Sequence, residues 1–447
     1  MKDNVDILYI EKVNSLLKGK KILILGFGKE GKSSFNFIST LSISTFLTVR
    51  DADLGRRHEI EEYVQGKAEV VVGDAYLDEL NKYDIILKSP GVPLRQLEGK
   101  VDFSKLSSQT DLMLNVFRNQ VVGITGTKGK STTSTLIYNL LSKMYTDVLL
   151  VGNIGRPPLD YFHQIKNDTI IIFEMSAHQL ELSKESPNIA ILLNLFEEHL
   201  DHYRSINAYY DAKWNIAKYQ YEGDVLIYNA DDSKIKSRIQ ILNSLAVKIP
   251  ISRERMQEYE FLFHSINNLS LQGEHNQMNL LFVIAIAGIF GIHDDLIINT
   301  VNSFLGLPHR LQFVGEYKGI TFYDDSISTI PEASMIAIST LGKVETLILG
   351  GMDRGISYDI LPDFLNTSFV KNIILVGETR WRLQELFLGV LNDKNIFIVE
   401  DYDELPQLIY DNTHEGNICL LSPAASSYDM FRDYEERGEY FQEIIKV

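Results

Sequence analysis

Residues 121–136 read VVGITGTKGKSTTSTL, so glycines, lysines and hydroxyls stand where a β-branched run meets a segment with helical spacing. A strand that enters a glycine-rich turn and then a helix directs backbone N–H groups and the helix dipole at one point, where an anion binds. In such a loop Lys130 would reach the outer phosphates of a nucleotide, and Ser131 or Thr132 would ligate magnesium. Because GTKGKS is shorter than G-x-x-x-x-G-K-[ST], the sequence predicts a relative of the common phosphate loop.

Three further residues whose side chains could take part in chemistry follow later in the same region. Glu174 ends the β-branched run of DTIIIFEMS, and a carboxylate there commonly completes a magnesium shell begun by a loop hydroxyl. His199, in NLFEEHLDHY, follows another apolar run, and a metal role and a structural role are both open for it. Parallel strands end at one edge of a sheet, so Ser131, Glu174 and His199 are predicted to converge there. Lys213, in YYDAKWNIAKY, has the pattern of a surface lysine on a helix.

A second glycine-rich loop lies near the N-terminus. GFGKEG at 26–31 follows a strand-like run, and Asp51 stands at the end of the next one. By itself this G-x-G-x-x-G pattern indicates a dinucleotide site of NAD type, although any nucleotide diphosphate can occupy such a loop. The first region is therefore predicted to bind a nucleotide-bearing ligand of a kind that the loop alone does not define.

Charged residues also open the last third of the chain. Arg310, in LPHR, could clamp a transferring phosphoryl group, and Asp325, in DDS, could face a nucleotide sugar or a magnesium ion. Each pattern is equally compatible with plain surface charge.

The elements that must position these residues alternate between short β-branched runs and helical patterns, which predicts an α/β fold of parallel sheets. Expected strands lie within 21–28, 43–51, 68–73, 83–91, 146–155, 168–176, 188–195, 223–232, 319–326, 344–351, 370–377, 394–401 and 417–424. We expect three α/β domains, at 1–106, 107–307 and 308–447. The first and last are predicted to be Rossmann-like, and the central one carries the phosphate loop on a parallel sheet.

The composition narrows the class of protein. The 447 residues carry a net charge of −17 without a lysine- or arginine-rich block, which argues against nucleic acid and anionic membranes as partners. The single cysteine, Cys419, lies in an apolar run and fits a core position in a reducing cytoplasm. The apolar run at 280–292 is shorter than a membrane span and is predicted to be a buried helix. We therefore expect a cytoplasmic protein without membrane insertion.

Taken together, these motifs resemble the Mur ligases from about residue 20 to the C-terminus. The resemblance rests on TGTKGKSTT, GNIG, E-M-S-x-x-Q-L-E, N-L-x-E-x-H-L-D-H, the Ala–Lys pair at 212–213, GEHNQMN, LPHRLQ, DDS and SPAASSYDMFRDYEERGEYF, in that order. The last motif and the short first block look most like the members that add glutamate to UDP-N-acetylmuramoyl-L-alanine. In that family the first block holds the UDP moiety, so the resemblance favours uridine diphosphate over NAD.

The resemblance implies an ATP-dependent ligase of peptidoglycan precursor synthesis, acting as a monomer on UDP-N-acetylmuramoyl-L-alanine, glutamate and ATP. The substrate carboxylate would be phosphorylated to an acyl phosphate, which the glutamate amine attacks. Two magnesium ions would be held by Ser131 and Glu174 and by His199 and a carbamylated Lys213, with Lys130 as the further cation. The implied ATP contacts are Gly126, Thr127, Lys128, Gly129, Lys130, Ser131, Thr132, Asn276, Arg310 and Asp325. The implied UDP-substrate contacts are Gly28, Lys29, Glu30, Asp51, Ser89 and Asn153. The implied glutamate contacts are Thr329, Arg354, Ser427, Tyr428 and Tyr434.

The glutamate pocket departs from the family pattern. Where D-S-K-A-T-N is usual, the chain reads DSISTI, so Ile327 replaces a lysine while Thr329 is kept. Tyr428 and Tyr434 stand at positions that are often leucine and phenylalanine. D-glutamate is the predicted substrate, and L-glutamate is the alternative.

Three other readings give different expectations. A ligase of the same superfamily with another substrate is disfavoured by GFGKEG and by the C-terminal motif. A non-catalytic nucleotide-sugar-binding module would be favoured by loss of Lys130, Glu174, His199 or Lys213, and all four are present. The third is an NAD-dependent oxidoreductase with an extra nucleotide domain, and the absence of an absorbance change with NADH would exclude it.

Overall fold

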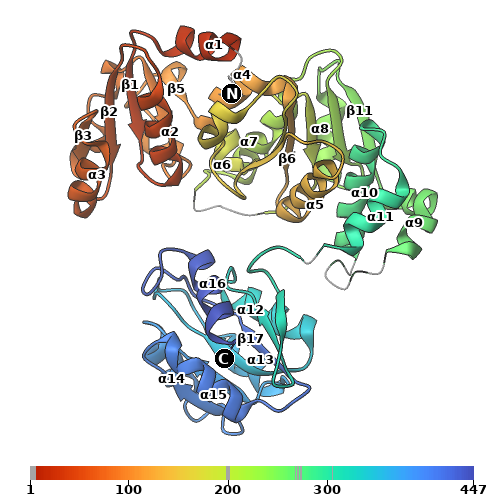
Figure 1. Cartoon of the computed structure of the whole chain (residues 1–447). Helices are drawn as coiled ribbons and strands as arrows, with labels where there is room; N and C mark the ends of the chain where they lie inside the picture. The colour runs from red at the N-terminus through yellow and green to blue at the C-terminus, as the bar shows by residue number, and fades with distance from the viewer. Residues whose placement is uncertain are drawn as a thin grey trace. The chain divides into compact units, whose positions relative to one another are not determined.

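The computed structural model describes residues 7–197, 202–266, 268, 271, 274–304 and 306–446. The chain forms two compact units, 1–303 and 304–447. Figure 1 shows their elements along the chain, with the first unit coloured from red to green and the second from teal to blue. None of the described helices is long and apolar enough to cross a membrane.

The N-terminal part of the first unit is a parallel five-stranded sheet of order β3-β2-β1-β4-β5. Its strands are β1 (Lys21–Leu25), β2 (Phe46–Asp51), β3 (Glu69–Val72), β4 (Ile85–Lys88) and β5 (Leu106–Ser107). The accompanying helices are α1 (Ile7–Leu17), α2 (Lys29–Thr40), α3 (Arg57–Val64) and α4 (Gln109–Phe117). The strand order reverses between β1 and β4, which makes the carboxyl edge there the expected ligand crevice.

The central part is a parallel six-stranded sheet of order β11-β10-β9-β6-β8-β7. The strands are β6 (Val121–Thr125), β7 (Val148–Gly152), β8 (Ile170–Glu174), β9 (Ile189–Leu192), β10 (Val225–Asn229) and β11 (Val247–Ile251). The helices are α5 (Lys130–Ser142), α6 (Ala177–Leu180), α7 (Ile206–Lys218), α8 (Ser233–Ile241), α9 (Glu260–Ser265), α10 (Glu274–Ile289) and α11 (Asp294–Asn302). The phosphate-loop helix α5 packs against α10 and α11, and the apolar run predicted as a buried helix is most of α10.

The second unit is a six-stranded sheet of order β12-β13-β17-β14-β15-β16, in which only the β12–β13 pair is antiparallel. The strands are β12 (Gln312–Tyr317), β13 (Ile320–Asp324), β14 (Val344–Leu349), β15 (Asn372–Leu375), β16 (Asn395–Ile398) and β17 (Ile418–Leu421). The helices are α12 (Pro331–Leu341), α13 (Leu361–Thr367), α14 (Arg380–Phe387), α15 (Leu405–Asn412) and α16 (Tyr434–Ile444). The α/β prediction is therefore confirmed, and Cys419 is buried in β17 as expected.

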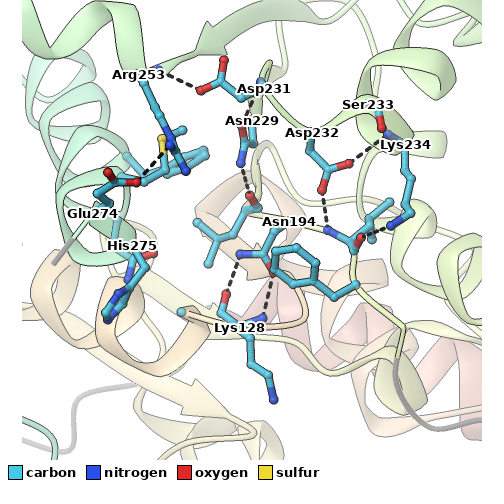
Figure 2. A pocket seen from close by; sticks show the side chains of 17 residues that line it. Lys128, Asn194, Asn229, Asp231, Asp232, Ser233, Lys234, Arg253, Glu274 and His275 are labelled. Atoms are coloured by element: carbon cyan, nitrogen blue, oxygen red, sulfur yellow. Dashed lines mark hydrogen bonds and ion pairs between the residues drawn. The ribbon is translucent and has the colours of Figure 1, made fainter. Parts of the chain in front are cut away.

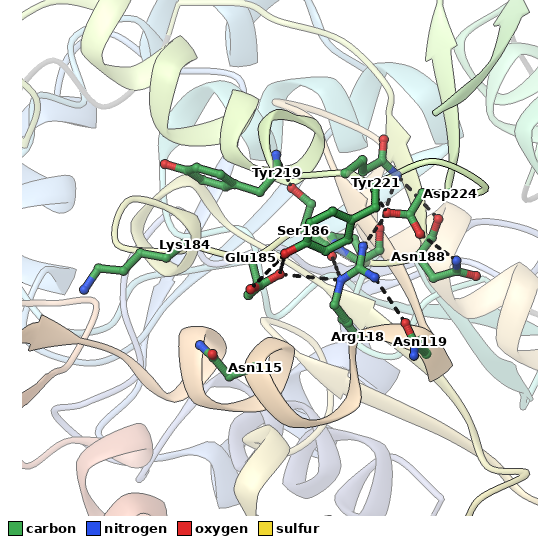
Figure 3. Close-up of polar contacts among 12 residues, drawn as sticks. Asn115, Arg118, Asn119, Lys184, Glu185, Ser186, Asn188, Tyr219, Tyr221 and Asp224 are labelled. Atoms are coloured by element: carbon green, nitrogen blue, oxygen red, sulfur yellow. Dashed lines mark hydrogen bonds and ion pairs between the residues drawn. The ribbon is translucent and has the colours of Figure 1, made fainter. Parts of the chain in front are cut away.

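A polar cluster closes the amino-terminal edge of the central sheet (Figure 3). Arg118, just before β6, pairs with Asp224, just before β10, and donates through Nε to the Ser186 carbonyl at 3.0 Å. Its guanidinium also lies 4.3 Å from the centre of the Tyr221 ring. Since the charges of Arg118 and Asp224 pair within the fold, these contacts join the segments that precede β6 and β10.

Candidate active site

The phosphate loop follows β6 and opens α5. Gly129, the residue before α5, has φ of +84°, a left-handed conformation that favours glycine. A Cβ at Gly129 would come within 2.5 Å of Asn279 Oδ1, and one at Gly126 within 2.8 Å of Leu193 Cβ. Gly129 is therefore favoured by its left-handed backbone, and Gly126 is required by close packing against Leu193.

Asn194, two residues after β9, holds the phosphate loop in place through hydrogen bonds. Its Oδ1 accepts hydrogen bonds from the backbone N–H groups of Thr127 at 3.0 Å and Lys128 at 2.8 Å, and its Nδ2 donates to the Lys128 carbonyl at 2.9 Å. Two of the loop N–H groups predicted to meet a phosphate thus hold the loop shape instead. In the first turn of α5, Lys130 Nζ donates to the Thr127 carbonyl at 2.9 Å, while Ser131 is half-buried.

Glu174 ends β8, the strand beside β6, and its side chain is fully buried. Asn153, in the loop after β7, donates to Glu174 Oε1 at 2.7 Å, and the Ser134 hydroxyl donates to Oε2 at 3.3 Å. The structure therefore brings the predicted metal carboxylate into contact with a predicted substrate residue and with the helix that starts at Lys130.

Lys213 lies on α7 and is only 2% exposed, so the surface position that its local pattern predicts is wrong. Its Nζ donates to the Gly126 carbonyl at 2.8 Å and sits 4.9 Å from the centre of the Tyr209 ring. The hydroxyl of Tyr209 is 3.3 Å from Thr127 Oγ1. α7 therefore places this lysine directly beneath the phosphate loop.

His199 lies in 198–201, outside the described residues. Among the described residues, no three histidine, cysteine or carboxylate side chains gather as a self-contained metal site. The Ser131 hydroxyl, in the first turn of α5, and the Glu174 carboxylate, at the end of β8 beside β6, are nevertheless ligand types that suit magnesium, which commonly binds one or two carboxylates together with substrate phosphates.

A cavity of about 610 Å³ opens beside the loop (Figure 2). Its lining includes Lys128 and Gly129 from the loop, Asp232 before α8, Arg253 after β11, and Glu274, His275 and Asn279 from α10. Asn279 Nδ2 donates to Asn276 Oδ1 at 3.2 Å, which connects the predicted nucleotide residue Asn276 to the cavity wall. The volume and the mixed polar and apolar lining suit a nucleoside base and ribose.

The N-terminal loop sits at the carboxyl edge of its own sheet. Gly26 has φ of +88°, and a Cβ at Gly31 would come within 2.1 Å of the Gly26 carbonyl oxygen, so both glycines are needed. Asp51, at the end of β2, accepts from the Phe27 N–H at 2.7 Å, and the Ser89 hydroxyl donates to the Gly26 carbonyl at 2.7 Å. The loop from Gly28 to Glu30 starts α2, so Lys29 lies in the first helical turn.

Comparison with known proteins gives this arrangement a family. A model of the Mur ligase middle domain matches residues 124–287. The chain is 30% identical over 453 residues to the UDP-N-acetylmuramoylalanine–D-glutamate ligase of Clostridium tetani, covering 96% of both chains. It is 32% identical over 444 residues to the enzyme of that name from Oceanobacillus iheyensis, covering 95% of this chain and 97% of the other.

The chain belongs to the Mur ligase family. Its fold resembles that of two solved ligases from Thermotoga maritima. UDP-N-acetylmuramate–alanine ligase MurC matches with a TM-score of 0.55 at 16% identity, over 95% of this chain and 98% of the other. The MurF ligase in complex with ADP matches with a TM-score of 0.54 at 15% identity, over 95% and 97%.

The second unit of this Mur ligase gathers its own predicted residues at a carboxyl edge. Thr329 follows β13, and Arg354 follows β14 and donates through Nη1 to Ser426 Oγ at 3.3 Å. Ser427, after β17, accepts from the Phe431 N–H at 2.8 Å through its carbonyl. The predicted glutamate residues Tyr428 and Tyr434 differ in burial: Tyr428 is exposed, and Tyr434, at the start of α16, is half-buried.

The predicted ribose residue Asp325 is buried beneath the loop that carries Arg310. Asp325 accepts from the Leu311 N–H at 3.1 Å and from the Ser422 hydroxyl at 2.7 Å, and burial raises the pKa of its carboxyl to about 6. His309, next to Arg310, has φ of +58°, and its Nδ1 lies 2.7 Å from Asp324 Oδ2. Arg310 is thereby held on a fixed turn of the second unit.

Sequence reasoning missed several residues that shape these sites. Asn194 stands inside NLFEEH and Asn279 inside GEHNQMN, so a polar amide beside a predicted loop was the available signal. Ser134 and Tyr209 carried no local signal, because only the pairing of strands and helices brings them to Glu174 and Thr127. In the second unit, buried Arg437 donates to the Ser326 and Ala425 carbonyls at 2.8 and 3.0 Å and ties the loops after β13 and β17 together.

Proposed function

We propose that this Mur ligase adds D-glutamate to UDP-N-acetylmuramoyl-L-alanine, with ATP, in the cytoplasmic synthesis of peptidoglycan precursor. The observation that carries the proposal is the phosphate loop of β6 and α5, set between buried Glu174 and buried Lys213. The full-length similarity to relatives named for this reaction supports the choice of substrates. We expect the enzyme to act as a monomer.

In the first step the substrate carboxylate oxygen attacks the γ-phosphorus of ATP. The bond between this phosphorus and the oxygen that bridges it to the β-phosphate breaks, so ADP departs and an acyl phosphate forms. Such transfers depend on positioning and on cations that offset developing charge. Lys130, at the start of α5, would contact the outer phosphates, and Gly126–Thr132 would surround them. Asn276 would meet the nucleoside in the cavity beside the loop, and Arg310 and Asp325 would complete the ATP contacts.

Magnesium, when bound, would neutralise charge on the phosphates and polarise the transferred group. We assign one ion to Ser131 and Glu174 and a second to His199 and carbamylated Lys213. Carbamylation converts the lysine ammonium to a carbamate, which offers oxygen atoms to the ion. The buried position of Lys213 beside the Gly126 carbonyl supports this assignment, since the modified side chain would remain at the loop.

In the second step the glutamate amine attacks the acyl carbon, phosphate leaves, and the amine loses a proton as the amide forms. Thr329, Arg354 and Ser427 are proposed to bind the glutamate carboxylates, with Tyr428 and Tyr434 beside them. The UDP moiety is assigned to the N-terminal loop, through Gly28, Lys29, Glu30, Asp51 and Ser89, and Asn153 to the sugar-peptide arm.

Phosphate release from ATP tests the proposal directly. Purified protein with magnesium and UDP-N-acetylmuramoyl-L-alanine is assayed with D-glutamate and L-glutamate in parallel. Release with D-glutamate alone is the expected result. Release with L-glutamate alone would support the alternative that Ile327, which replaces a lysine, favours the other handedness, and no release with either would favour a binding module.

A further inference from the structure

A histidine–aspartate pair lies at the carboxyl edge of the sheet in the second unit. His309 Nδ1 is 2.7 Å from Asp324 Oδ2, and the two side chains are 8% and 0% exposed. Gln442 of α16 donates through Nε2 to the same carboxylate oxygen at 2.7 Å, and the Ser326 N–H donates to Asp324 Oδ1 at 2.9 Å. These contacts hold the carboxylate in one orientation, facing the imidazole. We call His309 and Asp324 the edge dyad.

The fold makes room for the edge dyad in a specific way. His309 has a left-handed backbone, with φ of +58°, which is uncommon for a residue other than glycine. Its N–H donates to Gln312 Oε1 at 2.8 Å, and its carbonyl accepts from the Ile327 N–H at 3.1 Å. A Cβ at Gly438 of α16 would lie 2.1 Å from His309 Nδ1 and 2.5 Å from Asp324 Oδ2. Backbone strain of this kind persists where the surrounding structure enforces it, and it clusters at functional sites.

The contact at Nδ1 defines what the other ring nitrogen of His309 can do. The two nitrogens of an imidazole point in different directions, so Nε2 is directed away from Asp324. Over the residues that the structure describes, no hydrogen bond is made to this Nε2. A carboxylate that accepts from Nδ1–H selects the tautomer whose Nε2 carries a lone pair, which is the arrangement of a general base.

The edge dyad lies among the residues that we assign to glutamate. Ile327, whose N–H donates to the His309 carbonyl, is two residues before Thr329. The ring centres of His309 and Tyr434 are 6.2 Å apart. Arg310, a proposed ATP contact, is the next residue along the chain. The dyad is therefore beside the amino-acid contacts and beside a residue proposed to meet the nucleotide.

We propose that the edge dyad is the general base of the second step, with His309 Nε2 as the atom that takes a proton from the ammonium group of glutamate. This inference rests on the proposed function. An ammonium group has no lone pair and cannot attack the acyl phosphate. Transfer of one proton to Nε2 frees the lone pair for attack on the acyl carbon. The second proton leaves the nitrogen as the bond between the acyl carbon and the phosphate oxygen breaks, and the departing phosphate receives it.

The charges around His309 suit this role at neutral pH. They are Asp324 at the end of β13, Glu435 and Glu439 of α16, and the adjacent Arg310 of its own loop. Burial by itself would lower the pKa of His309, but the hydrogen bond and charge of Asp324, with Glu435 and Glu439, raise it above its ordinary value. A base is most effective when its pKa lies near the working pH. After proton transfer, the aspartate stabilises the imidazolium.

The test separates the second step from the first. His309→Asn keeps a residue that tolerates the left-handed backbone and can donate to Asp324, but it cannot take up a proton. Amide formation is followed as phosphate release with D-glutamate between pH 6 and 9. The acyl phosphate present in the same mixtures is trapped by borohydride reduction to the alcohol.

A second histidine–carboxylate pair provides the matched control. His414 Nδ1 is 2.8 Å from Glu345 Oε1. His414 precedes β17 and Glu345 is the second residue of β14, so this pair lies at the amino edge of the same sheet. His414→Asn should therefore leave the pH profile of wild type unchanged.

We expect His309→Asn to lower kcat at pH 7 by about 100-fold or more, with KM for ATP within about threefold of wild type and at least as much trapped acyl phosphate. Its kcat should rise by about tenfold per pH unit towards pH 9, because free amine then forms without a base. Wild type should lose activity only on the acid side, where His309 is protonated. Asp324→Asn should move this acid limb to lower pH, because the carboxylate no longer raises the pKa of His309.

The wild-type assay separates the two proposals, because no phosphate release with either glutamate would refute the proposed function itself. If wild type is active and His309→Asn keeps a similar kcat at pH 7, the general-base role is overturned. A loss that is equal at every pH, or that extends to the trapped acyl phosphate, overturns it as well, because His309 would then only hold the turn that carries Arg310. An acid limb that does not move in Asp324→Asn would remove Asp324 from the dyad.

Discussion

At the scale of single residues, Lys130 is the cation that the fold delivers to the phosphate loop. Lys130→Met should lower kcat for phosphate release by roughly 100-fold, as expected when one preorganised electrostatic contact is lost. Lys143→Met, at the exposed far end of the same helix, is the matched control and should stay within about twofold. Equal activity of the two variants would contradict the role given to Lys130.

Carbamylation of Lys213 gives a spectroscopic prediction. Protein incubated with carbon-13 bicarbonate should show a carbamate resonance that Lys213→Ala lacks and Lys218→Ala retains. Both lysines are on α7, but Lys213 is buried under the loop and Lys218 is exposed. A carbamate signal that persists in Lys213→Ala would assign the modification to another lysine.

Asp325 should make the stability of the second unit depend on pH. Burial raises the pKa of Asp325 from 3.8 to about 6, so ionisation favours the unfolded chain. The protonated Asp325 carboxyl therefore stabilises the folded unit fully below pH about 4, and this stabilisation is lost as the pH rises through about 6. The loss in the free energy of unfolding is roughly 3 kcal/mol at most. Asp325→Asn should remove this slope from the free energy of unfolding, measured by denaturant titration between pH 4 and 7. An identical slope in both proteins would contradict the prediction.

At the scale of elements, the strand–loop–helix joint of β6 and α5 depends on the backbone of Gly129. Gly129→Ala should cost about 1–2 kcal/mol through its left-handed φ, and Asn279 must also move away. The KM for ATP should rise accordingly. Gly288→Ala, in the last turn of α10 with open space where its Cβ would lie, is the control and should stabilise by up to roughly 1 kcal/mol. Thermal unfolding and ATP kinetics on both variants check the contrast.

At the scale of the whole molecule, the two compact units should be separable, whereas the two sheets of the first unit should not. A cut between 303 and 304 falls between units with separate cores, so fragments 1–303 and 304–447 should each fold. A cut at the predicted boundary after residue 106 would divide the apolar cluster that joins Phe37 to Phe162. Circular dichroism and proton NMR of the fragments measure this, and a well-folded isolated 1–106 would contradict it.

Local sequence was sufficient for most of the elements. The run DTIIIFEMS predicted β8 because a buried parallel strand needs only a continuous apolar, β-branched stretch bounded by polar residues. The phosphate loop could also be predicted from local sequence, since its glycines and lysines lie close together in the chain. Three strands were not predicted: β11, with proline in VKIPI, the two-residue β5, and β12. All three lie at sheet edges, which accept short or proline-containing strands.

The sequence alone determined the α/β class, the two glycine loops and the identity of the residues at the strand ends. Only the tertiary structure decided that Lys213 is buried under the loop, that Asn194 holds it, and that Glu30 meets Gln179. The physical reason is that strand and turn preferences act over a few neighbouring residues. Contacts between residues more than sixty positions apart depend instead on which strands lie side by side, and side-chain packing across the sheets sets that order.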